Sequence, residues 1–262
     1  MQLGPVTVDT VQYFLLVFIR ITAMLALMPV FGSQNVPFQL RTGLSFALTI
    51  ILFPFAGKVD PHSAIPIAMF VFLIIKEISV GLIVGYIASM LFSIVQFAGY
   101  LADSQMGFTF VEVVDPFTDM TITTMGQFQI LVFTMLFLAF NGHYFMILAI
   151  QKSFELIPIM GVNLPQGSLV NVMISVIATI FPLSFKLAAP IFITLILTSV
   201  AMAVIARTVP QINIFFVGIP LNIIIGLGMM FITLPLLALL FKQITQQIVG
   251  DIWKVLYLMA GR

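Results

Sequence analysis

Only a few side chains in this sequence could do chemistry, because most of them stand in long apolar runs. Arg20, the adjacent pair Lys76 and Glu77, and Lys186 each lie inside such a run. A charge there costs about 2.5–3.5 kcal/mol on insertion scales, so it normally faces a partner or water. We expect these residues to brace the chain internally or to contact another subunit. For Lys186, snorkelling to the membrane surface and pairing with a carboxylate are equally open.

The motifs of common enzymes are missing from the sequence. The chain has no cysteine, and its two histidines, His62 and His143, are too far apart for metal-ligand spacing. It contains no HExxH or Gly-x-Ser-x-Gly motif. Adjacent helical residues point about 100° apart, so Lys76 and Glu77 are not expected to pair with each other as a proton relay. We therefore predict that the protein is not an enzyme and needs no cofactor or metal.

The composition predicts a membrane protein. Hydrophobic residues make up 61% of the 262 residues and charged residues only 7%, whereas soluble domains carry about 25% charged residues. So few charges cannot cover a water-facing surface, and most of the surface must face lipid or other apolar protein. The formal net charge of +1 gives no electrostatic basis for nucleic acid binding. The first basic residue, Arg20, lies inside the first apolar run, so we expect that run to be retained.

Apolar segments that approach or exceed the roughly 20 residues of a transmembrane helix recur along the chain. They are residues 11–31, 42–55, 65–97, 128–150, 169–206 and 212–241. The second is short, and the third is interrupted by Lys76 and Glu77. The third and fifth exceed 30 residues, which indicates bent or tilted helices that pack against partners. We predict an all-α, polytopic membrane protein built from long kinked helices and hairpins.

The C-terminal part is typical of a helical hairpin. Proline lacks a backbone N–H, and prolines and glycines punctuate the change from one apolar block to the next. The expected turn residues are Arg207, Pro210, Asn213, Gly218 and Pro220. We predict one helix from about Leu169 to Ala206 and a second long helix that reaches past Phe241.

Residues 99–126 break the apolar pattern. They include four acids and no base, namely Asp103, Glu112, Asp115 and Asp119. Gly99 and Gly107 permit unusual backbone dihedrals, and the residue before Pro116 is driven away from helix. Irregular backbone at membrane depth survives only where it is buried in protein or lines a cavity. The residues by themselves fit a pore-facing loop and a plain connector equally well.

Four stretches, in order, resemble the FliR family, the flagellar biosynthetic membrane proteins of bacterial type III export, with close counterparts in injectisomes. The stretches are PVFGSQNVPFQLRTGLSFAL after Arg20, EISVGLIVGYIASMLFSIVQFAGYLADSQMGFTF closed by Asp115–Pro116, FLAFNGHYFMILAIQKSF, and RTVPQINIFFVGIPLNIIIGLG. Their order and spacing, and the total length, are similar to the family. The resemblance covers nearly the whole chain.

The resemblance implies a hetero-oligomeric export gate in the bacterial inner (plasma) membrane, at the flagellar basal body. In it, a pore-forming subunit of this kind assembles with FliP and FliQ, contacts FlhB and membrane lipid, and passes unfolded flagellar proteins. The implied fold resembles a fusion of a FliP-like N-terminal part at 1–165, including a pore loop at 99–126, with a FliQ-like C-terminal hairpin at 166–262. An equivalent injectisome subunit is the alternative, and a secondary transporter for a small solute is a more distant one.

The resemblance also implies that the loop helps to plug the closed pore. Closure needs apolar side chains on a movable backbone, and its acids should meet water or polar partners, since a buried unpaired carboxylate is costly. The expected plug residues are Gly99, Met106, Gly107, Phe108, Phe110, Val111, Asp115 and Pro116. Because methionine adapts to irregular contacts, sealing and ordinary core filling are both open for Met106.

Overall fold

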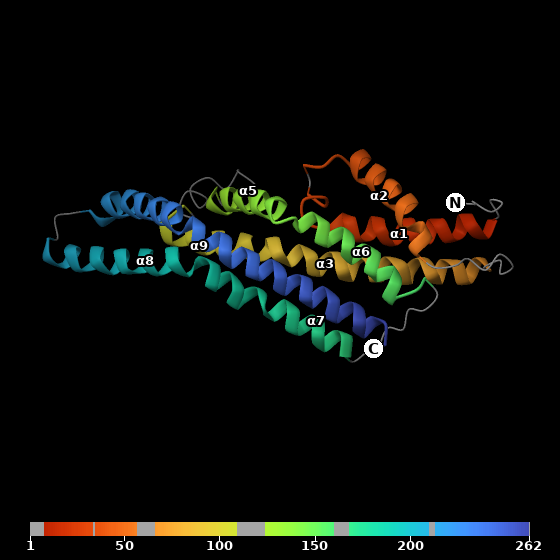
Figure 1. Ribbon diagram of the computed structural model, residues 1–262. Helices are drawn as coiled ribbons and strands as arrows, with labels where there is room; N and C mark the ends of the chain where they lie inside the picture. The colour runs from red at the N-terminus through yellow and green to blue at the C-terminus, as the bar shows by residue number, and fades with distance from the viewer. Residues whose placement is uncertain are drawn as a thin grey trace. The chain divides into compact units, whose positions relative to one another are not determined.

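The computed structural model describes residues 8–33, 35–56, 66–108, 124–159, 168–209 and 213–261. These residues form α-helices and one short 3-10 helix, with no strand among them, which confirms the all-α prediction. The elements, labelled in Figure 1, are α1 (Val8–Leu27), α2 (Phe38–Leu52), η1 (Phe53–Phe55), α3 (Ile67–Met106), α5 (Thr124–Ala139), α6 (Gly142–Leu156), α7 (Ser168–Ala178), α8 (Ile180–Thr208) and α9 (Ile214–Met259).

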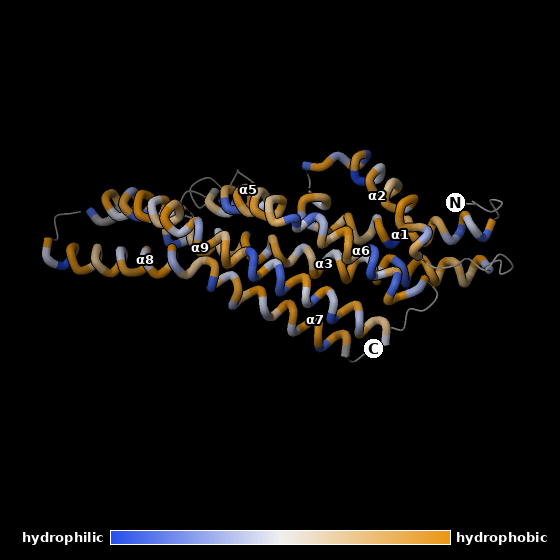
Figure 2. Tube along the Cα trace, in the orientation of Figure 1, coloured by the Kyte–Doolittle hydropathy of each residue, from blue (hydrophilic) through white to orange (hydrophobic). Residues whose placement is uncertain are grey.

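The polytopic membrane class is also confirmed. Within the described residues, 5 helices are long and apolar enough to cross a membrane, and the count rises to 6 if the bent pair α5 and α6 is one span. Figure 2 shows apolar residues along most of α8 and the first part of α9, with more polar residues on α6. Much of this apolar surface is exposed, as expected for helices that face lipid or partner proteins.

The chain divides into two compact units. Unit 1 contains Met1–Leu91, Asn141–Ile177 and Gln247–Arg262, and unit 2 contains Phe92–Phe140 and Ala178–Gln246. Each unit therefore combines N-terminal and C-terminal parts of the chain, and α3 and α9 contribute to both. The units are thus different from the halves 1–165 and 166–262, and the FliP-like and FliQ-like assignment of those halves stays a prediction.

In unit 1, α3 lies directly against the backbone of α1. Gly81 and Gly85 are four residues apart and so share one face of α3. A Cβ at Gly81 would lie 2.7 Å from the carbonyl oxygen of Arg20, and one at Gly85 would lie 2.7 Å from that of Met24. This pattern of small residues is the one that lets membrane helices approach closely. It brings the middle of α1 next to α3, where Arg20 and Glu77 lie.

In unit 2, the C-terminal part of α3 packs against α5 in the same way. A Cβ at Gly99 would overlap the backbone of Gly126 in the first turn of α5. An aromatic pair adds to this packing. The rings of Phe133 in α5 and Phe241 in α9 have centroids 4.7 Å apart. The rings thus join α5 to α9 beside the close contact of α3 with α5.

Two predicted segment boundaries were wrong. Lys76 and Glu77 do not interrupt α3, which is continuous to Met106. Glu77 pairs with Arg20 of α1, and Lys76 lies over the ring of Phe72. The segment 128–150 is not one straight span, because α5 ends at Ala139 and α6 begins at Gly142. Between them Asn141 has φ +58°, a left-handed conformation that asparagine tolerates better than most residues and that cannot continue a helix.

The C-terminal hairpin was predicted well, apart from four details. The break between helices falls between Thr208 and Ile214, and α9 continues far past Phe241. The first arm is two helices, α7 and α8, with a turn at Thr179.

The other three details are turn residues that proved helical. Arg207 lies in the last turn of α8, and Gly218 and Pro220 lie inside α9. Proline is tolerated in such helices because neighbouring groups satisfy the freed backbone carbonyl.

Candidate functional site

The described residues contain no group of three His, Cys, Asp or Glu side chains that could hold a metal ion. Their notable polar groups are instead two charged side chains at helix ends, both fully buried: Arg20 in unit 1 and Asp103 in unit 2. A methionine-rich apolar cluster lies next to Asp103. Each unit thus has its own candidate site, with Arg20 in unit 1 and with Asp103 and the cluster in unit 2.

Arg20 joins three helices of unit 1. Its Nε donates to Oε2 of Glu77 on α3, and both side chains are fully buried. Its Nη1 donates to the carbonyl oxygens of Ser153, at 3.0 Å, and Ile157, at 2.8 Å, at the C-terminal end of α6. The guanidinium also lies 4.6 Å from the ring centroid of Phe154. Arg20 thus braces the chain internally, one of the two roles expected from the sequence.

The local sequence explains why these groups meet. Glu77 lies one turn before Gly81, so its carboxylate is on the glycine face of α3 that contacts α1. On α1, Arg20 shares its face with Leu16 and Met24, both buried. The last carbonyls of a helix have no partner within it and carry partial negative charge. A guanidinium at the end of α6 satisfies those carbonyls, while Glu77 neutralises its charge.

The other two predicted charges do not join this network. Lys76 is next to Glu77 but points elsewhere, and its Nζ lies 4.9 Å from the ring centroid of Phe72, one turn away. Lys186 is exposed on α8, and its two proposed roles stay predictions. Lys76 and Glu77 thus contact different side chains, Lys76 within α3 and Glu77 on α1.

Asp103 joins α3 to the start of α5 in unit 2. Its carboxylate accepts hydrogen bonds from the backbone N–H of Met125, at 3.0 and 3.2 Å, and of Gly126, at 3.2 Å. The first N–H groups of a helix lack partners within it and favour an anion. The expectation that buried acids of this region would meet polar partners is confirmed for Asp103.

The backbone of Asp103 also takes part in the turn that ends α3. Its backbone carbonyl accepts the N–H groups of Gly107, at 3.0 Å, and Phe108, at 3.2 Å. Gly107 has φ +92°, a conformation that glycine adopts without steric cost. The unusual dihedral expected at Gly107 is therefore present, and it terminates α3.

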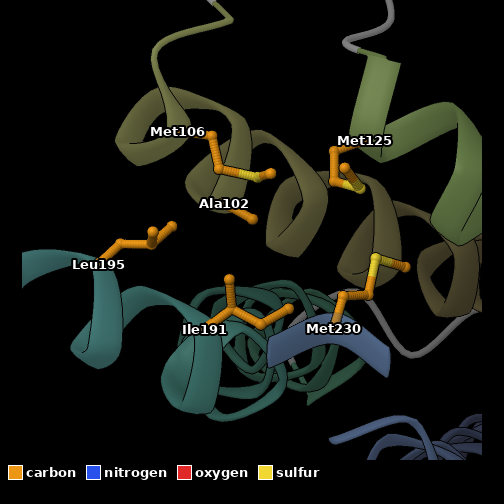
Figure 3. Close-up of a cluster of buried hydrophobic side chains, with 6 residues drawn as sticks. All are labelled: Ala102, Met106, Met125, Ile191, Leu195 and Met230. Carbon is orange, nitrogen blue, oxygen red and sulfur yellow. The ribbon is translucent and has the colours of Figure 1, made fainter. Parts of the chain in front are cut away.

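Three methionines meet in the cluster beside Asp103. Figure 3 shows the side chains, which come from α3, α5, α8 and α9: Ala102, Met106, Met125, Ile191, Leu195 and Met230. Met106 is almost completely buried, and a Cβ at Gly226 of α9 would lie 2.7–2.8 Å from its side chain. In this structure Met106 fills the core of unit 2.

The predicted plug residues do not all lie in a loop. Gly99 is helical rather than a flexible point, because α3 continues to Met106 and Gly99 serves close packing. Gly107 and Phe108 form the turn that follows. Outside the described residues lie Phe110, Val111, Asp115 and Pro116, and also Pro210 of the predicted hairpin turn.

Sequence reasoning missed the backbone partners of both buried charges. The carbonyls of Ser153 and Ile157 and the N–H groups of Met125 and Gly126 carry no signal in their side chains. It also missed Asn222, whose Nδ2 donates to the carbonyl oxygen of Gln105 at 3.3 Å. An amide inside the long apolar run of α9 was the one available hint.

Comparison with known proteins agrees with the resemblance seen in the sequence. Residues 11–248 match the family of bacterial export proteins, family 1. Similar relatives include the flagellar biosynthetic protein FliR of Bacillus subtilis (strain 168), 33% identical over 90% of this chain and 92% of the relative. Those of Aquifex aeolicus (strain VF5), 30% identical over 86% of each chain, and Escherichia coli (strain K12), 27% identical over 84% and 83%, are also similar. The chain therefore belongs to the bacterial export proteins of family 1, the FliR family.

Proposed function

We propose that this chain is a pore-forming subunit of the flagellar type III export gate in the bacterial inner membrane. It assembles with FliP-like and FliQ-like membrane subunits, contacts an FlhB-like subunit, and passes unfolded flagellar proteins. Membership of an export family supports this role. The flagellar names of the relatives favour a flagellar system over an injectisome.

The length of the apolar helices is the observation that carries the assembly part of the proposal. With 40 residues, α3 is about 60 Å long at about 1.5 Å per residue, roughly twice the hydrocarbon thickness of a bilayer. Its exposed apolar side chains are Ile67, Met69, Val71, Phe72, Ile75, Ile78, Leu82, Tyr86 and Tyr100. α3 would fit within the hydrocarbon layer only if it were tilted by about 60° from the bilayer normal. Membrane helices are tilted by about 0–40°. One bilayer does not cover a helix of this length from end to end, and this supports contact with partner subunits.

The buried charges favour a scaffold over a solute transporter. Transporters bring polar groups together around a substrate site near the middle of the membrane. Here Arg20 and Asp103 bind helix ends of their own chain. Their contacts are those of structural braces.

The experiment that tests assembly is co-expression. We expect the chain alone to aggregate in detergent, and to elute as a stable complex when it is expressed with its FliP-like and FliQ-like partners. Co-expression with an unrelated polytopic protein of similar size is the control and should not rescue it. A monodisperse, stable monomer that transports a small solute would overturn the proposal.

The plug is a second part of the proposal. The apolar residues Met106, Phe108, Phe110 and Val111 are near or within the segment that the FliR resemblance assigns to closure. Met106 fills a buried cluster, so a substitution there would also change the core. The test is therefore made at residues that follow this cluster in the sequence. We expect a double substitution, Phe110→Ser with Val111→Ser, to raise the ion conductance of the assembled complex in liposomes. Unchanged conductance in a normally assembled complex would show that the plug lies elsewhere.

A further inference from the structure

Asp103 forms hydrogen bonds both at the end of α3 and at the start of α5. Its backbone carbonyl accepts the N–H groups of Gly107 and Phe108, and its carboxylate accepts those of Met125 and Gly126. The connection between these two ends is residues 109–123, which lie outside the described part of the chain. One fully buried residue thus bonds to the backbone on both sides of that connection.

Neighbouring contacts fix Asp103 in place. Gly99, Asp103 and Met106 are spaced four and three residues apart, so they share one face of α3. Gly99 lies against the backbone of Gly126, and Met106 joins Met125 in the buried cluster. The face of α3 that carries the carboxylate is therefore in contact with α5 on both sides of it.

The last turn of α3 is held by α9 as well. Asn222 donates to the carbonyl oxygen of Gln105, and Gly226, one turn further along α9, leaves only enough space for the side chain of Met106. The end of α3 is consequently packed against two other helices of the same unit. A movement of this end would disturb all of these contacts together.

We propose that Asp103 is a positioning residue, a fixed anchor that keeps Gly107–Phe108 and Met125–Gly126 together in every state of the protein. Release of the carboxylate would break its buried hydrogen bonds with the N–H groups of Met125 and Gly126, which is strongly unfavourable. Any rearrangement that accompanies export then takes place outside these four residues. This statement concerns the fold, and only its effect on conductance rests on the proposed gate function.

An anchor differs from a simple helix cap in a way that hydrogen exchange measures. A cap affects only the N–H groups that it accepts, at Met125 and Gly126. An anchor couples both ends, so removal of the carboxylate also exposes the N–H groups of Gly107 and Phe108, although their own acceptor, the carbonyl of residue 103, is still present. The two readings therefore predict different patterns for the same variant.

The test is hydrogen–deuterium exchange of Asp103→Ala in the co-expressed complex, or in the full chain in nanodiscs if no complex forms. We expect exchange about tenfold faster at Met125 and Gly126, with a parallel rise at Gly107 and Phe108. The control is Ser104→Ala, whose hydroxyl bonds to the carbonyl of Leu101 in the same helix, and it should leave all four amides unchanged. A rise confined to Met125 and Gly126, or no rise at all, would overturn the anchor.

A second variant and a second readout cover the case in which Asp103→Ala does not fold. Asp103→Asn keeps one acceptor oxygen in place, so it should show the same coupled rise with a smaller amplitude. In an assembled complex, the anchor predicts higher ion conductance for Asp103→Ala than for the unmodified chain, and partial recovery with Asp103→Asn. Unchanged conductance with coupled exchange would count against the proposed gate function but not the anchor, while unchanged exchange would refute the anchor alone.

Discussion

Unit 1 and unit 2 each contain a fully buried charge at a helix end, but the two charges are satisfied differently. Arg20 binds the carbonyl end of α6, and Asp103 binds the N–H end of α5. Each sign matches the partial charge of the helix end that it meets. In both units the acid on α3 is spaced four residues from a packing glycine, Glu77 from Gly81 and Asp103 from Gly99. A close helix contact therefore excludes water from both charges.

The difference lies in what remains when the charge is removed. Loss of Arg20 would leave the buried carboxylate of Glu77 without its partner, whereas loss of the Asp103 carboxylate would leave neutral N–H groups. An uncompensated buried charge costs more than an unpaired amide. The ion pair of unit 1 should therefore be the more sensitive of the two sites.

The largest effect is expected for Arg20→Ala. Breaking one side of a buried ion pair costs about 3–5 kcal/mol, whereas replacing both partners with apolar residues is often close to neutral. We therefore expect a large fall in the Tm of the purified co-expressed complex for Arg20→Ala, and substantial recovery for the double variant Arg20→Met with Glu77→Leu. The measurement is thermal unfolding in one detergent. If the double variant is as unstable as the single one, the contacts of Arg20 with α6 contribute more to stability than its ion pair with Glu77.

A smaller effect is expected at the packing glycines. A methyl group added at Gly81 in unit 1 or Gly99 in unit 2 would overlap backbone atoms, and overpacking of this kind costs about 1–3 kcal/mol. Matched controls are Gly43→Ala and Gly228→Ala, where no atom lies within 4 Å of the new Cβ and the helix gains about 0.5–1 kcal/mol. Equal Tm shifts for the four variants would show that these glycines serve flexibility rather than packing.

Asp103→Asn should have a still smaller effect on stability. The amide keeps one acceptor for the first turn of α5 but loses the charge, and a change of this type at a helix N-terminus costs about 1 kcal/mol. The Tm should fall by less than for Arg20→Ala in the same detergent. A larger fall than for Arg20→Ala would reverse the ranking of the two units.

The smallest effect is expected for Lys186→Gln. Lys186 is exposed on α8, so its removal leaves no buried group without a partner. We expect no measurable change in the Tm of the co-expressed complex. A fall comparable to that of Arg20→Ala would show that an exposed charge in an apolar helix braces the fold after all.

The sequence predicted the unit 1 site better than the unit 2 site for a physical reason. A charge in an apolar run is expensive, so Arg20 and Glu77 were each expected to have a partner, although their pairing with each other was not predicted. Gly99 and Asp103 instead carry local signals of a loop, since glycine and aspartate are poor helix formers. Contacts with Gly126 and with the first N–H groups of α5 override those local preferences. This is why the helix continues through Gly99 to Met106.

By itself the sequence determined the helical membrane class and the family. A chain with so few charges must face lipid or apolar protein, and lipid demands that backbone groups be satisfied within helices. Only the tertiary structure decided which helix ends Arg20 and Asp103 satisfy, and where α3, α5 and α6 begin and end. The physical reason is that the partners are backbone groups, which every residue carries alike, so only the folded chain shows which ones lie within hydrogen-bonding distance.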